Sequence, residues 1–325
     1  MRAVVFDKAG GPEALRVAEV PDPVAGEREV VIDVHATALN RADLLQRRGL
    51  YAPPPGASQI LGLECAGVVR EVGAHVTAAR VGERVMALLP GGGYAERAVV
   101  HERSCLPIPA ALTFSEAAAV PEAFLAASEI LFHVGRGAQD ERVLIHAAGS
   151  GVGTAAVQLA HEAGLSVIAT TSSSKVERVR ALGAERVVSR EQEDFAAAVA
   201  EFSGGNGVDL IVDLVGAAYA EKNQRCLATR GRHVIVGLVG GAKAEIDFGQ
   251  LLRKRQALLG FVMRSQSTEE KGAIVERFRT RWFSHLEHGT LRPIVDRVLP
   301  LAEAPQAHAR MEANETFGKI VLSVR

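Results

Sequence analysis

Cysteine, tryptophan and net charge are all scarce in this sequence. Its 325 residues include one tryptophan and three cysteines, Cys65, Cys105 and Cys226, which lie far apart and form no Cys-x-x-Cys pair. The sequence therefore indicates neither a disulfide framework nor a cysteine-rich zinc site. The formal net charge is -1, so the basic surface that binds nucleic acid or an acidic membrane is not expected either.

Long hydrophobic runs are missing as well. No apolar stretch is long enough to span a bilayer, and the charged start, Met1 to Lys8, is typical of a strand rather than of a signal peptide. We therefore expect a cytoplasmic protein with no membrane partner. Hydrophobic residues make up 48% of the chain and charged residues 23%, and the length is sufficient for two domains.

Glycine is abundant, with 32 residues, and one glycine-rich stretch organises the chain. Val143 to Ile145 is an apolar run typical of a buried parallel strand. Val152 to Ala163 places small and apolar residues at helical spacing before Gly164, and Ser166 to Thr170 predicts a second strand. This is a βαβ unit whose turn can bind a pyrophosphate, because small residues admit the phosphate and the helix N-terminus offers free N–H groups.

The turn of this unit departs from the strict Gly-x-Gly-x-x-Gly spacing but keeps its small residues. We expect these turn residues to bind the cofactor: Ala148, Gly149, Ser150, Gly151, Val152 and Gly153. The alternative is a glycine-rich turn that binds nothing. The strand on one side and the helix on the other favour the cofactor interpretation.

The end of the second strand indicates which dinucleotide is bound. An NAD-specific fold places a carboxylate there for the ribose hydroxyls, whereas this stretch offers Thr171, Ser172 and Lys175. Hydroxyls and an ammonium accept a 2′-phosphate, so the sequence predicts NADP(H). Arg190, after the next strand, is either a second cation for the phosphate or a solvated surface arginine. The serines can also cap the following helix.

The alternation of patterns along the chain predicts an α/β protein. Residues 1–120 show short strands separated by glycine and proline, typical of a small barrel-like catalytic domain. Residues 121–262 alternate strands and helices, which predicts a Rossmann-type doubly wound parallel sheet. Residues 263–325 end in a strand that can return to the first domain. Ligands bind at the carboxyl ends of such parallel strands, and the further expected cofactor contacts are Gly216, Gly237, Leu238, Phe261 and Met263.

Several segments resemble the quinone oxidoreductases, the zinc-independent, zeta-crystallin-like branch of the medium-chain dehydrogenase/reductase superfamily. The match begins with Asn40 to Tyr51, Pro53 to Gly56 and Leu61 to Gly67, and is most similar to the tumour-suppressor-inducible subfamily. His146 to Gly153 and Met311 to Asn314 extend it over essentially the whole chain. The resemblance implies a GroES-like first domain, NADP(H), Asn314 as a cofactor contact, and a homodimer or homotetramer.

Zinc-dependent relatives place metal ligands at positions that look equivalent to Asn40 and Leu63. Leucine cannot ligate a metal, and an asparagine amide is a poor zinc ligand. We therefore expect no metal. Glu64 is more typical of a structural carboxylate than of a ligand.

The resemblance also implies that Asn40 and Tyr51 are the catalytic residues, because the family places an asparagine and a tyrosine of this segment near the nicotinamide. Asn40 can donate a hydrogen bond to a carbonyl oxygen as hydride arrives. Tyr51 can donate its phenol proton or stack on a flat ring. The alternatives are a helix cap for Asn40 and loop packing for Tyr51. Leu45 and Ala126 stand where the family often has tyrosine and threonine, which affects ring binding and substrate choice.

The favoured function is an NADPH-dependent reductase acting on quinones. A neighbouring enzyme function is reduction of the double bond of an enone or alkenal, since both reactions need a flat acceptor and an oxyanion donor. A different class is a non-catalytic NADPH-binding protein. The strand Ala257 to Val262 is expected at the edge of its sheet, where pairing with a second copy would cover its free N–H and C=O groups.

Overall fold

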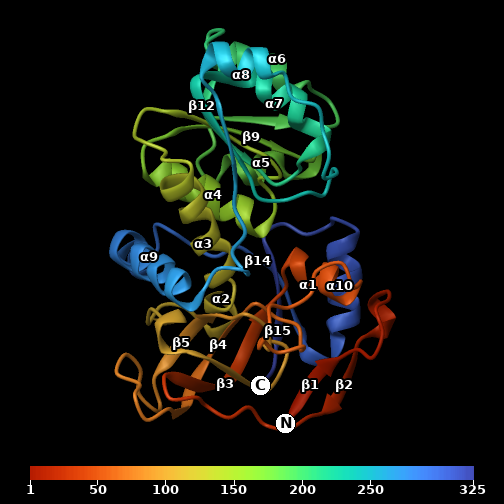
Figure 1. Cartoon of the computed structure of the whole chain (residues 1–325), viewed down its shortest axis with the longest axis vertical. Helices are drawn as coiled ribbons and strands as arrows, with labels where there is room; N and C mark the ends of the chain where they lie inside the picture. Colours follow the sequence, from red (N-terminus) through yellow and green to blue (C-terminus); the bar gives the residue numbers. More distant parts are fainter. The chain divides into compact units, whose positions relative to one another are not determined.

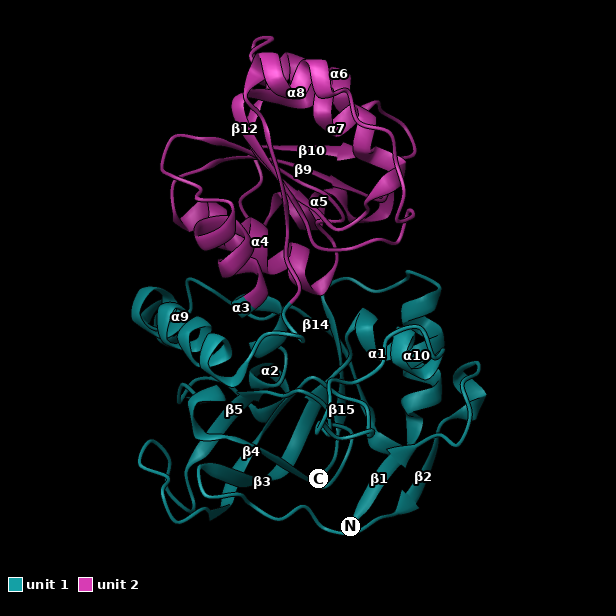
Figure 2. Ribbon diagram, viewed as in Figure 1, with its two compact units in different colours: residues 1–125, 263–325 teal, residues 126–262 magenta.

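The computed structural model describes all 325 residues. They divide into two compact units, coloured separately in Figure 2: unit 1 consists of residues 1–125 and 263–325, and unit 2 of residues 126–262. The sequence placed the first boundary between residues 120 and 121, five residues earlier. No helix is both long and apolar enough for a membrane span.

Unit 2 contains a six-stranded parallel sheet in the order β10-β9-β8-β11-β12-β13. This confirms the Rossmann-type fold (Figure 1). Its strands are β8 (Arg142–Ile145), β9 (Ser166–Thr171), β10 (Arg186–Ser189), β11 (Val208–Asp213), β12 (Leu227–Ile235) and β13 (Ala257–Gly260). The order reverses between β8 and β11, and such a point is where doubly wound sheets bind ligands.

Helices precede and connect these parallel strands. They are η3 (Glu129–Val134), α4 (Gly151–Glu162), η4 (Ser173–Lys175), α5 (Val176–Arg180), α6 (Phe195–Phe202), η5 (Ala217–Tyr219), α7 (Ala220–Cys226) and α8 (Phe248–Lys254). The expected buried run of β8 is fully buried: Val143, Leu144 and Ile145 are each 0% exposed. α4 ends before Gly164, whose φ of +75° is the left-handed conformation that glycine adopts at helix ends.

Unit 1 is built on a mainly antiparallel sheet in the order β14-β15-β3-β4-β5-β7, with β6 paired to β3, and a separate β1-β2 pair. The strands are β1 (Arg2–Val5), β2 (Arg16–Glu19), β3 (Glu29–Ala38), β4 (Glu64–Val72), β5 (Arg84–Leu88), β6 (Arg97–His101), β7 (Cys105–Pro107), β14 (Val295–Pro300) and β15 (Lys319–Ser323). β15 pairs antiparallel with β3, so the last strand of the chain returns to the first third. This β-rich unit is the GroES-like domain of the fold.

Unit 1 also carries helices around its sheet. They are η1 (Pro12–Ala14), α1 (Arg41–Arg47), η2 (Glu102–Ser104), α2 (Phe114–Ala117), α9 (Thr268–His288), η6 (Leu301–Glu303) and α10 (Ala304–Glu312). α3 (Pro121–Ser128) contains the boundary between the two units. α3 is followed directly by the π-helical η3.

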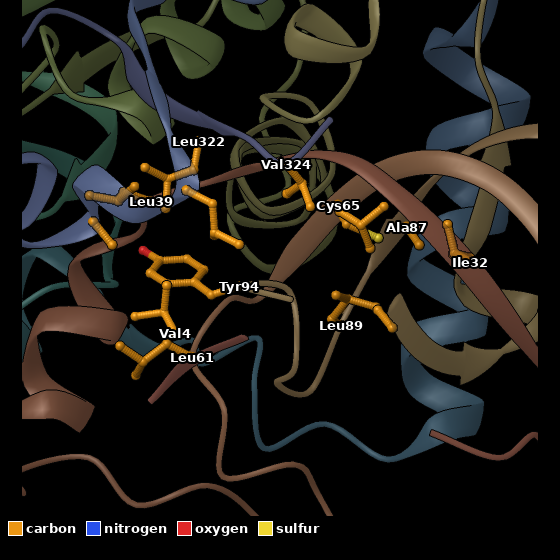
Figure 3. Close-up of a cluster of buried hydrophobic side chains, with 14 of the residues drawn as sticks. Val4, Ile32, Leu39, Leu61, Cys65, Ala87, Leu89, Tyr94, Leu322 and Val324 are labelled. Atoms are coloured by element: carbon orange, nitrogen blue, oxygen red, sulfur yellow. The ribbon is translucent and has the colours of Figure 1, made fainter. Parts of the chain in front are cut away.

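Alternating side chains of the unit 1 strands form a single apolar core. Figure 3 shows part of this core, in which Leu39, Leu61 and Leu322 lie around the ring of Tyr94. Each of these four side chains is 0% exposed. Burial of this apolar surface from strands far apart in the sequence holds the C-terminal segment against the N-terminal one.

Candidate functional site

The glycine-rich turn of unit 2 presents free backbone donors at the carboxyl end of β8. Ser150 caps α4, and its Oγ accepts a hydrogen bond from the Gly153 N–H at 3.1 Å. The N–H groups of Gly151 and Val152, the first two residues of α4, donate to no group of the protein. Free amides at the positive end of a helix dipole are the donors that suit a phosphate or diphosphate.

Glycine is required at the end of this turn for close packing. A Cβ at Gly153 would lie 2.4 Å from the Ala147 carbonyl oxygen, far inside van der Waals contact. Ala147 itself has a φ of +50°, which L-residues rarely adopt. The predicted residues from Ala148 to Gly153 therefore form one tight turn with its amides exposed at the helix start, and the turn fits the diphosphate of a dinucleotide.

A buried carboxylate shapes the neighbouring turn after β11. Asp213 Oδ1 accepts hydrogen bonds from the Val215 and Gly216 N–H groups at 2.7 and 2.9 Å. Asp213 Oδ2 lies 2.8 Å from His233 Nε2. These bonds hold the turn at the switch point of the sheet.

The expected contacts Gly216, Gly237 and Leu238 lie together at this edge of the sheet. A Cβ at Gly216 would lie 3.1 Å from the Gly237 carbonyl oxygen and 3.0 Å from Leu238 Cδ2. Gly216 has a φ of +85°, so a side chain there would also be strained. Leu238 is 55% exposed, which leaves an apolar surface at the carboxyl ends of the strands.

The expected 2′-phosphate residues also come together, because β9 and β10 are paired. The Arg190 N–H donates to the Thr171 carbonyl oxygen at 2.9 Å. Ser172 and Lys175 lie in the turn that follows Thr171. A cavity of about 120 Å³ beside this pair is lined in part by Arg190, by Tyr219 of η5 and by Lys222 of α7.

The same place holds a carboxylate that the sequence analysis missed. Glu191 accepts hydrogen bonds from the Ser173 N–H at 2.8 Å and from the Ser173 hydroxyl at 3.0 Å. Arg190 Nε donates to its other oxygen at 2.9 Å. Arg190 and then the Ser173 bonds lower the pKa of Glu191 to about 2, so this carboxylate is ionised under all ordinary conditions.

In unit 1, Asn40 is placed at the start of α1 by a local bond, since its N–H donates to Asp43 Oδ2 at 2.8 Å. Its side chain is turned towards Glu64 and Lys319. Nδ2 donates to Glu64 Oε1 at 2.8 Å, and Oδ1 accepts from Lys319 Nζ at 2.6 Å. The second Nδ2 hydrogen has only the Ala38 carbonyl oxygen within reach, at 3.4 Å, which is beyond the usual length of such a bond.

Lys319 completes this network and is fully occupied by it. Its ammonium lies 2.6 Å from Glu64 Oε1 and donates to the Leu39 carbonyl oxygen at 2.7 Å as well as to Asn40. The other Glu64 oxygen accepts from the Glu122 N–H at 2.9 Å. Glu64 and Lys319 are 0% and 4% exposed. They form a buried ion pair that orients the Asn40 carboxamide.

Tyr51 lies outside regular secondary structure and is half-buried. The guanidinium carbon of Arg264 sits 5.3 Å from the centre of its ring, a cation–π contact. Burial raises the pKa of the Tyr51 phenol, so the group is a neutral hydrogen-bond donor.

The last three expected cofactor residues are divided between the units. Phe261 belongs to unit 2 and Met263 to unit 1, and both are buried. Asn314, also in unit 1, has a φ of +58° and accepts a hydrogen bond from Arg41 Nη2 at 2.7 Å. The structure thus groups the turn residues of unit 2 with one another and places Asn40, Tyr51, Met263 and Asn314 in unit 1.

Comparisons with known proteins agree with this architecture. Residues 26–110 match the family described as alcohol dehydrogenase GroES-like domain, and residues 151–278 match the family described as zinc-binding dehydrogenase. A quinone oxidoreductase of Pseudomonas aeruginosa is 33% identical, over 99% of this chain and 99% of its own length.

Solved structures of several enzymes superpose on the full chain. The Escherichia coli quinone oxidoreductase complexed with NADPH has a TM-score of 0.87 and 29% identity, covering 100% of both chains. An NAD-dependent alcohol dehydrogenase has a TM-score of 0.87 and 34% identity, again covering both chains fully. The CurK enoyl reductase has a TM-score of 0.88 and 28% identity, covering 100% of this chain and 99% of its own.

The GroES-like unit and the Rossmann-type unit with its open glycine turn define an oxidoreductase of the medium-chain dehydrogenase/reductase class, whose members bind NAD(P). Within that class, this chain belongs to the quinone oxidoreductase family.

Proposed function

We propose that the protein is an NADPH-dependent quinone reductase that works without zinc. The observation that carries this proposal is the pair of unpartnered amides, Gly151 and Val152, at the start of α4 and at the switch point of the parallel sheet. Together with the full-length likeness to quinone oxidoreductases, they support a dinucleotide that donates hydride to an acceptor.

NADP(H) rather than NAD(H) is supported by the cations near the end of β9. Lys175 and Arg190 both lie at the paired ends of β9 and β10, where the 2′-phosphate of the adenosine half is expected. The negative charge of Glu191, at the same place, repels a phosphate. We propose that Arg190 turns from Glu191 towards the phosphate when NADPH binds, so that the preference for NADPH is moderate.

In the proposed reaction the bound cofactor supplies a hydride from C4 of its nicotinamide. The Nδ2 hydrogen of Asn40 that has only a weak protein partner donates to the acceptor oxygen as negative charge develops on it. Glu64 and Lys319 keep the carboxamide from rotating. Tyr51 holds the flat acceptor by its ring, and the reduced quinone takes its proton from solvent. Tyr51→Phe should therefore be mild, whereas Tyr51→Ala should raise KM.

Zinc independence is supported by the side chains around Glu64. Leu63 offers no donor atom, and the Lys319 ammonium already neutralises the Glu64 carboxylate at 2.6 Å. A dication at this carboxylate would meet the repulsion of a buried ammonium. Prolonged treatment with a chelator should leave turnover unchanged. Stoichiometric zinc by elemental analysis, with loss of activity on its removal, would contradict this part of the proposal.

The function is tested by NADPH oxidation with ortho- and para-quinones and with simple enones, with identification of the products. We expect the highest kcat/KM with quinones. Reduction of the carbon–carbon double bond of an enone or alkenal is the second candidate, supported by the likeness to an enoyl reductase. Turnover of enones alone would favour it, and tight NADPH binding without turnover of any acceptor would indicate a non-catalytic protein.

We further propose that the protein acts as a homodimer or homotetramer in the cytoplasm. β13 pairs only with β12, so its outer edge has free N–H and C=O groups that a second copy would cover. The three cysteines are free thiols, which suits a reducing compartment. A monomeric mass by light scattering at micromolar concentration would count against the oligomer.

A further inference from the structure

Arg264 is a buried cation whose hydrogen-bonding capacity is mostly unused. The residue is 4% exposed, and its Nε donates to the Pro90 carbonyl oxygen at 3.0 Å. Both terminal nitrogens, Nη1 and Nη2, are buried without a hydrogen-bond partner. Four N–H groups of a charged side chain are thus unsatisfied, and such groups are costly to bury unless something accepts their hydrogen bonds.

A second buried cation lies next to Arg264. Lys271 is also buried, and its ammonium donates to the Arg264 carbonyl oxygen at 2.8 Å. Among the acidic groups whose charge acts on Arg264, Asp43 already accepts hydrogen bonds from Asn40, Gly62 and Tyr94.

The remaining acidic neighbours do not supply a negative charge at neutral pH. They are Glu122 and Tyr51. Burial raises the pKa of Glu122 to about 8 and raises that of the Tyr51 phenol, so both groups are mainly protonated. No ionised group within the protein therefore pairs with this cation.

The guanidinium is next to Tyr51, the residue expected to hold the acceptor. Arg264 lies over the Tyr51 ring, and Tyr51 belongs to a loop rather than to a helix or strand. Gly91 is also close, since a Cβ there would lie 3.6 Å from Nη2. The guanidinium is thus flanked by an aromatic ring on a loop and by a residue without a side chain.

We propose that Arg264 binds a carboxylate carried by the hydride acceptor, with Tyr51 against its conjugated plane. Two terminal N–H groups in a planar fork match the two oxygens of a carboxylate, and the pairing neutralises the buried charge. The preferred acceptors are therefore conjugated carbonyl compounds, quinones or enones, that bear a carboxylate. This inference rests on the proposed function and names the substrate class of that site.

The test compares a naphthoquinone that carries a propanoate side chain with its methyl ester. The saturated linker keeps the redox potential of the two quinones nearly equal, so the ratio of their kcat/KM values reports recognition of the carboxylate. In the wild type we expect the acid to be favoured by roughly tenfold or more, the effect of a charge-assisted hydrogen bond. Arg264→Met should bring the ratio to about one, and Arg264→Lys should retain part of the preference.

Each ratio is measured within one variant, so partial misfolding of a variant does not distort it. Arg80→Met is the matched control, because it removes the same charge from an exposed turn and should leave the ratio unchanged. An unchanged ratio in Arg264→Met would overturn the proposal. So would a raised KM for NADPH without a change in the ratio, because the guanidinium would then serve the cofactor.

A second measurement separates this inference from the proposed function. Calorimetric titration with 2-naphthoate and with methyl 2-naphthoate needs no turnover, so it applies even if no quinone is reduced. Tighter binding of the acid to the wild type, lost in Arg264→Met, supports the carboxylate site. Equal affinity for acid and ester in the wild type would show that water alone satisfies Arg264.

Discussion

Replacing Lys319 by methionine should destabilise unit 1 strongly, because Lys319 is the only cation paired with the buried Glu64 carboxylate. The substitution removes an ammonium that lies 2.6 Å from Glu64 and 2.6 Å from Asn40 Oδ1. Breaking one partner of a buried ion pair costs about 3–5 kcal/mol. Glu64 retains the N–H donors of Asn40 and Glu122, which places the expected loss at about 3 kcal/mol, the lower end of that range.

The assay is urea unfolding followed by the fluorescence of Trp282. This is the single tryptophan of the chain. It is buried in α9 of unit 1, so it reports on the unit that contains the ion pair. Lys8→Met, at an exposed position, is the control for loss of a positive charge.

The double variant Lys319→Met, Glu64→Gln decides the interpretation. Neutralising Glu64 removes the unpaired buried charge, so the double variant should recover part of the stability that the single variant loses. A loss below about 1 kcal/mol in Lys319→Met, the scale of an exposed pair, would refute the reasoning. A double variant that is less stable than the single one would do the same.

Three further predictions concern the cofactor, the reaction and pH. Lys175→Ala should weaken the binding of NADPH by about 1–2 kcal/mol more than the binding of NADH. Glu191→Gln should strengthen the binding of NADPH and leave that of NADH unchanged, and fluorescence titration measures both variants. Equal effects on the two cofactors would show that these residues do not contact the 2′-phosphate. Asn40→Ala should lower kcat and kcat/KM together by up to roughly a hundredfold in steady-state kinetics. Wild-type values of both constants would show that Asn40 is not the hydrogen-bond donor to the acceptor oxygen. Because burial holds the pKa of Glu122 at about 8, above its ordinary 4.5, the folded state loses stability as pH rises from 4.5 to about 8. Glu122→Gln should therefore stabilise the protein by about 1–3 kcal/mol more at about pH 9 than at about pH 5 in urea unfolding, and a pH-independent difference would contradict the assigned shift.

The βαβ unit could be predicted because its signals are local. The strand, the turn and the helix around Ser150 all occur where the sequence pattern predicts them. Helix boundaries depend on capping as well as on periodicity. α9 begins at Thr268 because Ser267 and Glu270 cap each other. These two residues carried a recognisable capping-box signal.

Short strands that depend on tertiary pairing were not predicted. β2 (Arg16–Glu19) is largely exposed and exists through its pairing with β1. β14 (Val295–Pro300) pairs in parallel with β15 and has little buried surface of its own. Neither segment has the alternation that marks a half-buried strand, so single-sequence patterns give no signal for them.

The residues that surround the candidate site were missed for a similar reason. Lys319 is 279 positions from Asn40 in the sequence, and no local spacing indicates that they touch. A local pattern searches for the carboxylate only at the end of β9, whereas the pairing of β9 with β10 brings Glu191 there from the segment after β10. Arg264 follows the expected contact Met263 directly, but the unpaired state of its two terminal nitrogens is a property of the folded chain.

Transfer of hydride from NADPH to a quinone is the central claim, and single-turnover kinetics tests it most directly. The chelator-treated protein is loaded with NADPH, deuterated or not at each of the two C4 positions in turn, and mixed rapidly with excess quinone while NADPH absorbance is followed. The account predicts a single decay to NADP⁺, slowed by deuterium at one C4 position only. NADPH that stays bound and unoxidised in the presence of every quinone would contradict it.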